Sequence, residues 1–226
     1  RQNISLPDLR ATIARAADEL RAAIRDNPSN YAFLAGFAEF ATTAYDVDAS
    51  YLTEAEKVLA DAEALSPRRQ TTEYLLSKIL YLKGDSEGAL AALDRAVLLD
   101  PEVGEPHFYY GMLLLRTGDV PSAGRELDLA ERFGRAPKNA AEAAMLGSYF
   151  GDAEDSARSI RYFQKALLYD SGDIESKLKL GLVYHFDRQH DAARNILRDV
   201  MRTEDLKKSP QYPSLLPILR ELGLSK

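Results

Sequence analysis

The chain has 226 residues, of which 46% are hydrophobic and 28% are charged, as in ordinary globular proteins with a buried core. Its formal net charge of −6 gives no electrostatic basis for binding nucleic acid or an anionic membrane surface. Cysteine is absent, which excludes disulfides, thiol catalysis and cysteine-based zinc sites, and no apolar run approaches the roughly 20 residues of a membrane span.

The first predicted element is a helix within residues 5–28. Ser5 is placed to cap it, Asp8 stands at the third helical position, and Pro28 marks its end. Its small and apolar residues repeat the spacing found before Pro67: Ala16, Leu20 and Ala23 correspond to Ala55, Leu59 and Ala62. We therefore expect this helix to be half of a repeated unit, with extra residues near 45–49 before the next half.

A period of 34 residues then organises the chain. Pro67 recurs as Pro101, and Gly84-Asp85 recurs as Gly118-Asp119; the later intervals are 36 and 34 residues. Each unit reads as two helices separated by a Gly-Asp turn, with the aspartate placed to cap the second helix. The predicted units cover residues of about 30–67, 70–103, 104–139, 140–173 and 174–207.

Small residues mark where the two helices of a unit meet. A large residue followed by Ser or Gly recurs in each first helix, and paired alanines seven residues apart recur in the second helices at 89 and 96 and at 123 and 130. The pairs of a large residue followed by Ser or Gly are Leu76-Ser77, Tyr110-Gly111, Leu146-Gly147 and Leu180-Gly181. We expect neighbouring units to stack, because no unit can bury its apolar face alone.

The last predicted element is an amphipathic capping helix of about residues 213–222, which Gly223 is placed to stop. The whole chain, 1–226, is thus expected to be one all-α domain.

Two stretches resemble sites of chemistry. Residues 84–88 read GDSEG, the pattern of a serine nucleophile, but that motif needs a strand before the serine, and residues 74–83 have a helical pattern. His185 and His190 stand near aspartates, yet zinc helices place histidines four apart, whereas these are five apart and lie at an expected turn between two helices. We expect no catalytic residue, no metal site and no cofactor.

The pattern resembles the tetratricopeptide repeat, most clearly over residues 70–103. Leu76, Ser77, Leu80, Gly84-Asp85, Ala89, Leu93, Ala96 and Pro101 stand where that family has its signature residues. Glu73 replaces the usual large aromatic, Arg135 and Ser171 replace the terminal proline, and Val200 replaces the final alanine. The resemblance implies a right-handed α-solenoid.

In that family the first helix of each unit lines a concave groove. By resemblance the groove residues here are Tyr74, Lys78, Tyr81, Phe108, Met112, Leu115, Arg116, Ser148, Leu182 and His185, with Glu105 beside them. Only Lys78 and Arg116 carry positive charge, which argues against the family's clamp for acidic C-terminal tails. The groove is expected to hold an amphipathic or apolar protein segment, unless the array's own side chains fill it. Phe108→Ala or Tyr74→Ala is then expected to weaken binding with little loss of helicity.

Three functions are open at this point. The first is a non-catalytic scaffold that binds a protein or peptide partner. The second follows from residues 51–56, 65–70 and 104–107, which resemble the C-terminal repeat region of bacterial O-antigen ligase/polymerase-like membrane proteins. That resemblance implies a soluble cytoplasmic or periplasmic part of a longer protein, in keeping with Arg1 as the first residue, and several apolar spans upstream would support it. The third is self-association as a homo-oligomer.

Overall fold

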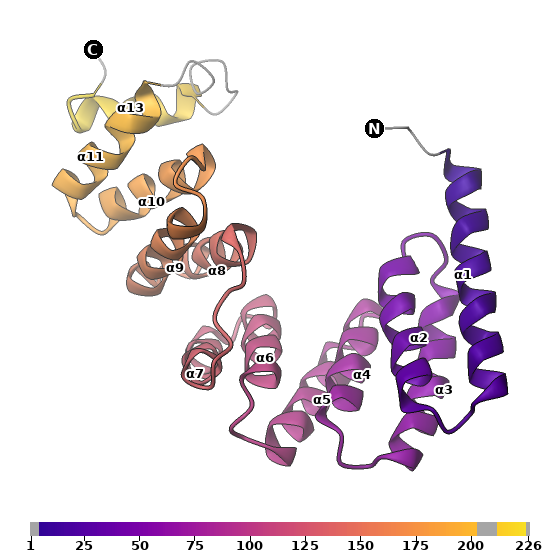
Figure 1. The fold of residues 1–226 in the computed structure, drawn as a ribbon. Helices are drawn as coiled ribbons and strands as arrows, with labels where there is room; N and C mark the ends of the chain where they lie inside the picture. Colours follow the sequence, from indigo (N-terminus) through magenta and orange to yellow (C-terminus); the bar gives the residue numbers. More distant parts are fainter. Residues whose placement is uncertain (1–4, 203–211, 225–226) are drawn as a thin grey trace. The chain divides into compact units, whose positions relative to one another are not determined.

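The computed structural model describes residues 5–202 and 212–224, and within these ranges the secondary structure is helical, with no strand. The described residues form twelve α-helices (Figure 1). Their bounds are α1 Leu6–Asp26, α2 Tyr31–Ala44, α3 Ser50–Leu65, α4 Gln70–Leu82, α5 Ser86–Leu99, α6 Gly104–Thr117, α7 Val120–Arg132, α8 Ala140–Asp152, α9 Ser156–Tyr169, α10 Ile174–Phe186, α11 His190–Met201 and α13 Tyr212–Glu221. The predicted all-α fold is confirmed.

The chain divides into two compact units. The first consists of Arg1–Thr117 with Arg125–Arg135, and the second of Gly118–Gly124 with Ala136–Lys226. Each unit is built from helices that are antiparallel neighbours in sequence, so its core forms from local pairs. The organisation of the chain as a single domain stays a prediction.

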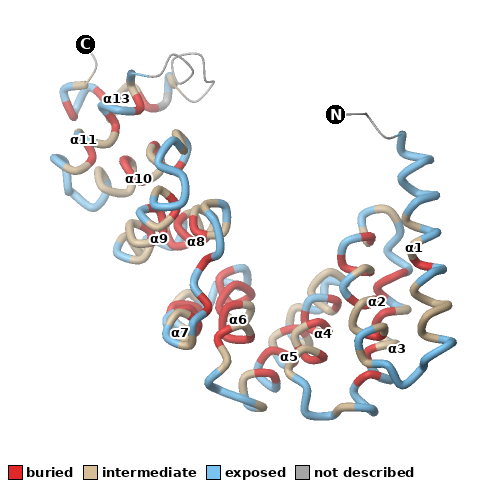
Figure 2. Tube along the Cα trace, viewed as in Figure 1, coloured by how far each residue is buried: buried red, intermediate tan, exposed pale blue. Residues whose placement is uncertain are grey.

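The first unit has its main core among α1, α2, α3 and α4. Phe37 and Leu59 are fully buried there, together with a series of alanines that let the helices approach closely. Arg21 of α1 joins Glu54 of α3 through two hydrogen bonds of 2.8 and 2.6 Å. Figure 2 shows that α1 is mostly exposed, whereas α6 is buried along most of its length.

The second unit shows why the predicted small residues recur. A Cβ added at Gly147 would lie 2.9 Å from the ring of Phe163, and one added at Gly181 would lie 2.5 Å from Leu197. In both pairs the first helix therefore presents bare backbone to a large side chain of the second. Leu197 also belongs to a core shared with α13, which includes Leu215 and Leu219.

The turns between paired helices share one backbone form. Gly84 has a φ of 88° and Gly118 a φ of 92°, the left-handed region in which glycine carries no steric penalty. At the corresponding turns of the second unit Glu154 and Arg188 both have a φ of 61°. Two backbone hydrogen bonds close the turns at Gly84, Glu154 and Arg188 across the helix end. The longer-range bonds are Asp85 N–H to Leu80 O, Asp155 N–H to Phe150 O and Gln189 N–H to Tyr184 O, and shorter-range bonds from Gly84, Glu154 and Arg188 accompany them.

Side-chain caps start many of the helices. Ser5 accepts a hydrogen bond from the backbone N–H of Asp8, and Asp85 accepts one from Gly88 N–H at 2.8 Å. Asp119 accepts one from Ser122 N–H at 3.1 Å. Ser86 is the first residue of α5 and follows helix α4, so the GDSEG stretch is a turn between helices, as expected. At the C-terminal end α13 closes with Gly223 at a φ of 68°, close to the predicted stop.

Candidate functional site

The first half of the predicted groove lies on α4 and α6 of the first unit. Tyr74 stacks on Tyr109 with ring centroids 5.4 Å apart, and the guanidinium of Arg116 lies 5.1 Å above the ring of Tyr81. Lys78 is exposed. The two helices are therefore bridged by their own aromatic side chains along the face where a partner was expected.

The large residues of α6 lie inside the protein rather than on an open face. Phe108 is 4% exposed, and Met112 and Leu115 are also buried. The guanidinium of Arg135 lies 3.6 Å above the Phe108 ring and forms a 2.9 Å ion pair with Glu105. Phe108→Ala therefore tests the core of the first unit, so it is not suited to testing a binding face. The assignment of these residues to a partner groove stays a prediction.

Burial changes the acidity of the bridging tyrosine. Partial burial of the Tyr74 hydroxyl, with smaller contributions from Glu39, Tyr109 and Glu105, raises its pKa to about 12. The phenol is therefore neutral at physiological pH and acts as a hydrogen-bonding and stacking group.

Two departures from the repeat pattern turn out to be buried ionic groups. Glu73, at the position of the usual aromatic, is buried and accepts hydrogen bonds from Arg95 of α5 at 2.9 to 3.2 Å. Arg135, at the position of a terminal proline, is buried against Phe108 and Glu105. Pairs of this kind hold their helices in one arrangement, because separating them would leave a charge buried alone.

An open hollow lies between α8 and α10 in the second unit. Its volume is about 340 Å³, and it lies on the first helices of two successive pairs. The wall formed by α8 is mostly apolar, and the wall at the start of α10 is polar. The lining residues are Ala141, Ala144, Met145 and Ser148 of α8, and Asp173, Glu175, Ser176 and Lys179 at the start of α10.

A short polar chain crosses this hollow. The ammonium of Lys179 donates to the hydroxyl of Ser148 at 3.2 Å and pairs with Glu175 at 2.9 Å. Asp173 is engaged differently, because its carboxylate caps α10 by accepting from the N–H groups of Glu175 and Ser176. Of the predicted groove residues, Ser148 is the one that lines this hollow.

The other two groove residues predicted in the second unit lie elsewhere. Leu182 packs on the core formed by α10, α11 and α13, and His185 lies beside Glu221 of α13. Met145 and Lys179 were missed by the sequence reasoning. The i,i+4 pair of Glu175 and Lys179 was the available signal for Lys179, but such pairs are common on exposed helix faces.

The three histidines have different surroundings. His107 is buried and both ring nitrogens are engaged, one with Glu126 at 2.6 Å and the other with the carbonyl of Pro101 at 2.9 Å. His185 and His190 belong to two different helices, and the turn between them brings their ring centroids to 5.4 Å. The two histidines flank the expected turn, so a spacing of five residues does not keep their rings apart.

Comparison with known proteins agrees with this architecture. Residues 74–140, which span most of α4 and all of α5, α6 and α7, match the tetratricopeptide repeat family model. No curated protein sequence matches the chain. Within the part of the chain that the structure describes, no helix is long and apolar enough to cross a membrane.

Several solved structures are similar to the chain. YrrB, described as a TPR protein with an unusual peptide-binding site, is 17% identical with a TM-score of 0.60, over 84% of this chain and 94% of that one. MamA from Desulfovibrio magneticus RS-1 is 21% identical with a TM-score of 0.58, over 78% and 98%. A chain of the APC/C Cut9–Hcn1 hetero-tetramer is 17% identical with a TM-score of 0.57; the match covers 87% of this chain and 38% of that one.

These matches do not bear on the resemblance to the O-antigen ligase-like proteins, which stays a prediction, as do the compartment and self-association. At identities this low the likeness concerns the fold alone. The helix pairs described above have the fold of tetratricopeptide-repeat solenoids.

Proposed function

We propose that the chain is a non-catalytic interaction module that binds a protein or peptide segment in the hollow between α8 and α10. The observation that carries this proposal is the hollow itself, with an apolar wall facing a polar one on the first helices of two successive repeats. Its volume is large enough for a few side chains of a partner and lies at the low end of the range for ligand sites. The tetratricopeptide fold, and the peptide-binding site named for YrrB, support the same class of partner.

The two walls define the chemistry of the partner. Met145 offers an adaptable thioether and Ala144 a methyl group, so an apolar side chain of the partner is expected against α8. The ammonium of Lys179 has three donors, and Ser148 and Glu175 engage two of them. The remaining donor can bind a backbone carbonyl or a carboxylate of the partner. The expected ligand is therefore an amphipathic segment with an apolar face.

Filling the hollow tests the proposal. Peptides are first selected from a random display library on the unmodified chain. Ala144→Trp is expected to weaken the selected peptides at least about tenfold, because an indole occupies the space of a partner side chain. The matched control is Leu168→Trp, which adds an indole on α9 where the leucine is already 87% exposed; its affinity is expected to be unchanged. Peptides that bind both variants as tightly as the unmodified chain would rule this site out.

Loss of the polar contact is a second arm of the same experiment. Lys179→Met keeps the length of the side chain and removes the charge, and it is expected to weaken peptide binding several-fold, less than the indole does. Circular dichroism of each variant shows whether the helices are intact.

A further inference from the structure

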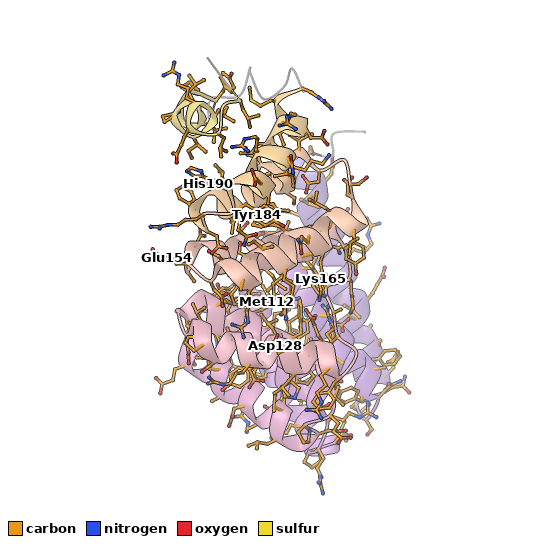
Figure 3. All side chains as sticks on the ribbon, turned by 90° about the vertical axis from the view of Figure 1, so that its left-hand side faces the viewer. Met112, Asp128, Glu154, Lys165, Tyr184 and His190 are labelled. Carbon is orange, nitrogen blue, oxygen red and sulfur yellow. The ribbon has the colours of Figure 1, made fainter. Side chains whose placement is uncertain are left out.

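Three side chains of types that can bind metal ions meet where the turn between α10 and α11 lies against the end of α13. His185 is in the last turn of α10, His190 is the first residue of α11, and Glu221 is the last residue of α13. One ligand atom from each lies within 4.8 Å of the other two. Figure 3 labels His190 at this end of the second unit. All three residues belong to that unit, and none of them lines the hollow between α8 and α10.

The separation between His185 and Glu221 fits a shared ion better than a direct hydrogen bond. Nε2 of His185 lies 3.6 Å from Oε2 of Glu221, beyond the roughly 2.7–3.2 Å of an N–H···O bond. Two ligands bound to one tetrahedral zinc at about 2.0–2.2 Å are roughly 3.4 Å apart. Two imidazoles on such an ion have ring centroids about 5.2 Å apart, and those of His185 and His190 are 5.4 Å apart.

The hydrogen bonding of His185 is a second, independent observation. Its side chain is only 10% exposed, and its Nδ1 is buried without a hydrogen-bond partner among the described residues. Its Nε2 is also without a hydrogen bond to these residues, since Glu221 lies 3.6 Å away, and buried ring nitrogens are normally paired. The carboxylate of Glu221 is 62% exposed, and an ion pair at 3.6 Å with such a group is weakened by water and salt. Neither ring nitrogen of His185 therefore has a hydrogen-bond partner among the described residues, and an ion at Nε2 would engage the nitrogen that faces Glu221, with Nδ1 left to a bridging water.

We propose that His185, His190 and Glu221 bind one Zn²⁺ or a similar divalent transition-metal ion, which fastens α13 to the α10–α11 pair. Two imidazoles and one carboxylate form a donor set that suits zinc, with a fourth position left for water. The backbone around the site is already fixed, because Nε of Arg194 donates to the carbonyl of Leu222 at 3.0 Å and Leu219 is buried against α11. Binding therefore requires adjustment mainly of the exposed His190 and Glu221 side chains.

The histidine content of the chain makes the proposal directly testable. The chain has three histidines, and His107 is engaged by Glu126 and Pro101 in the first unit. When ZnCl₂ is titrated into the untagged protein, NMR signals of the His185 and His190 rings are expected to move together and saturate at one equivalent. The His107 signals are expected to stay in place, which makes this residue an internal control.

Calorimetry with ZnCl₂ on single variants tests the ligand set. His190→Ala and Glu221→Gln both change exposed side chains, so folding is expected to be preserved, and each is expected to weaken zinc at least about tenfold. Asp199→Asn, an exposed acid on α11 that pairs with Lys177, is the control and is expected to bind zinc as the unmodified chain does. Zinc is also expected to raise the melting temperature of the unmodified chain, with reversal by EDTA, and not that of the two ligand variants.

Two results would overturn the proposal. One is an absence of movement of the His185 and His190 signals up to about 1 mM ZnCl₂, well above the affinity of a three-ligand site. The other is zinc binding of undiminished affinity in both His190→Ala and Glu221→Gln.

Discussion

Asp85 and Ser86 are neighbours at the start of α5, and only the side chain of Asp85 caps the helix. The carboxylate of Asp85 accepts from the N–H of Gly88 and so satisfies one of the free donors at the helix end. Ser86 is the first helical residue, in a turn that follows a helix instead of the strand required by a nucleophile elbow. The function of a serine thus depends on the backbone before it, which a five-residue pattern does not encode.

This difference can be measured by chemical denaturation. We expect Asp85→Ala to lower the free energy of unfolding by about 1 kcal/mol, because the cap hydrogen bond is lost. Ser86→Ala is the matched control one residue away and is expected to change it by less than about 0.5 kcal/mol. Urea unfolding followed by circular dichroism reports both values. Equal losses in the two variants would contradict the assignment of the cap to Asp85.

At the scale of the element, sequence reasoning was strongest for the helix pairs. Glycine before aspartate identified the turns at Gly84 and Gly118. The predicted cap residues were confirmed, as were the glycines at which a second helix packs closely. The turn around Arg188 was also expected, but the positive φ of Glu154 and Arg188 was not, because there the backbone hydrogen bonds of the helix end hold ordinary residues in a conformation typical of glycine. For Phe108 the sequence left two alternatives open, a partner groove and packing within the array; the side chain is buried, with Arg135 of a later segment against its ring.

The substitution of glycine by alanine is expected to have opposite effects in two helices, depending on whether another helix lies close to the glycine. Gly181→Ala would place a Cβ 2.5 Å from Leu197, so we expect it to destabilise the protein by about 1–3 kcal/mol. Gly36→Ala in α2 meets nothing within 4 Å and is expected to stabilise by about 0.5–1 kcal/mol, because alanine favours the helix. Thermal unfolding of the two variants compares them directly. A stabilised Gly181→Ala protein would show that the helices are not in close contact there.

At the scale of the whole chain, each of the two units has a core of its own. Phe37 and Leu59 lie in the core of the first unit, and Leu197 and Leu219 in that of the second. In repeat proteins the free energy of unfolding is close to a sum of terms for single repeats and for neighbouring repeats. A substitution that destabilises one helix pair therefore need not destabilise distant pairs.

Native-state hydrogen exchange tests this independence. Leu197→Ala is expected to lower the opening free energy of amides in α10 and α11 by about 3 kcal/mol, because it leaves a cavity beneath a fully buried side chain. Amides in α2 and α3 of the same variant are expected to keep their protection within about 0.5 kcal/mol. A uniform loss across all helices would instead indicate that the chain unfolds as one cooperative block.

The hydrogen bonds between successive helix pairs also affect how quickly the chain can fold. The Arg21–Glu54 and Tyr31–Thr72 hydrogen bonds join residues 33 and 41 positions apart, and the partners within one pair are closer still. Little loop entropy is lost in forming such contacts, so structure can begin at any pair and spread to its neighbours. During synthesis the earliest pairs can thus complete their packing while the last helices are still inside the ribosome.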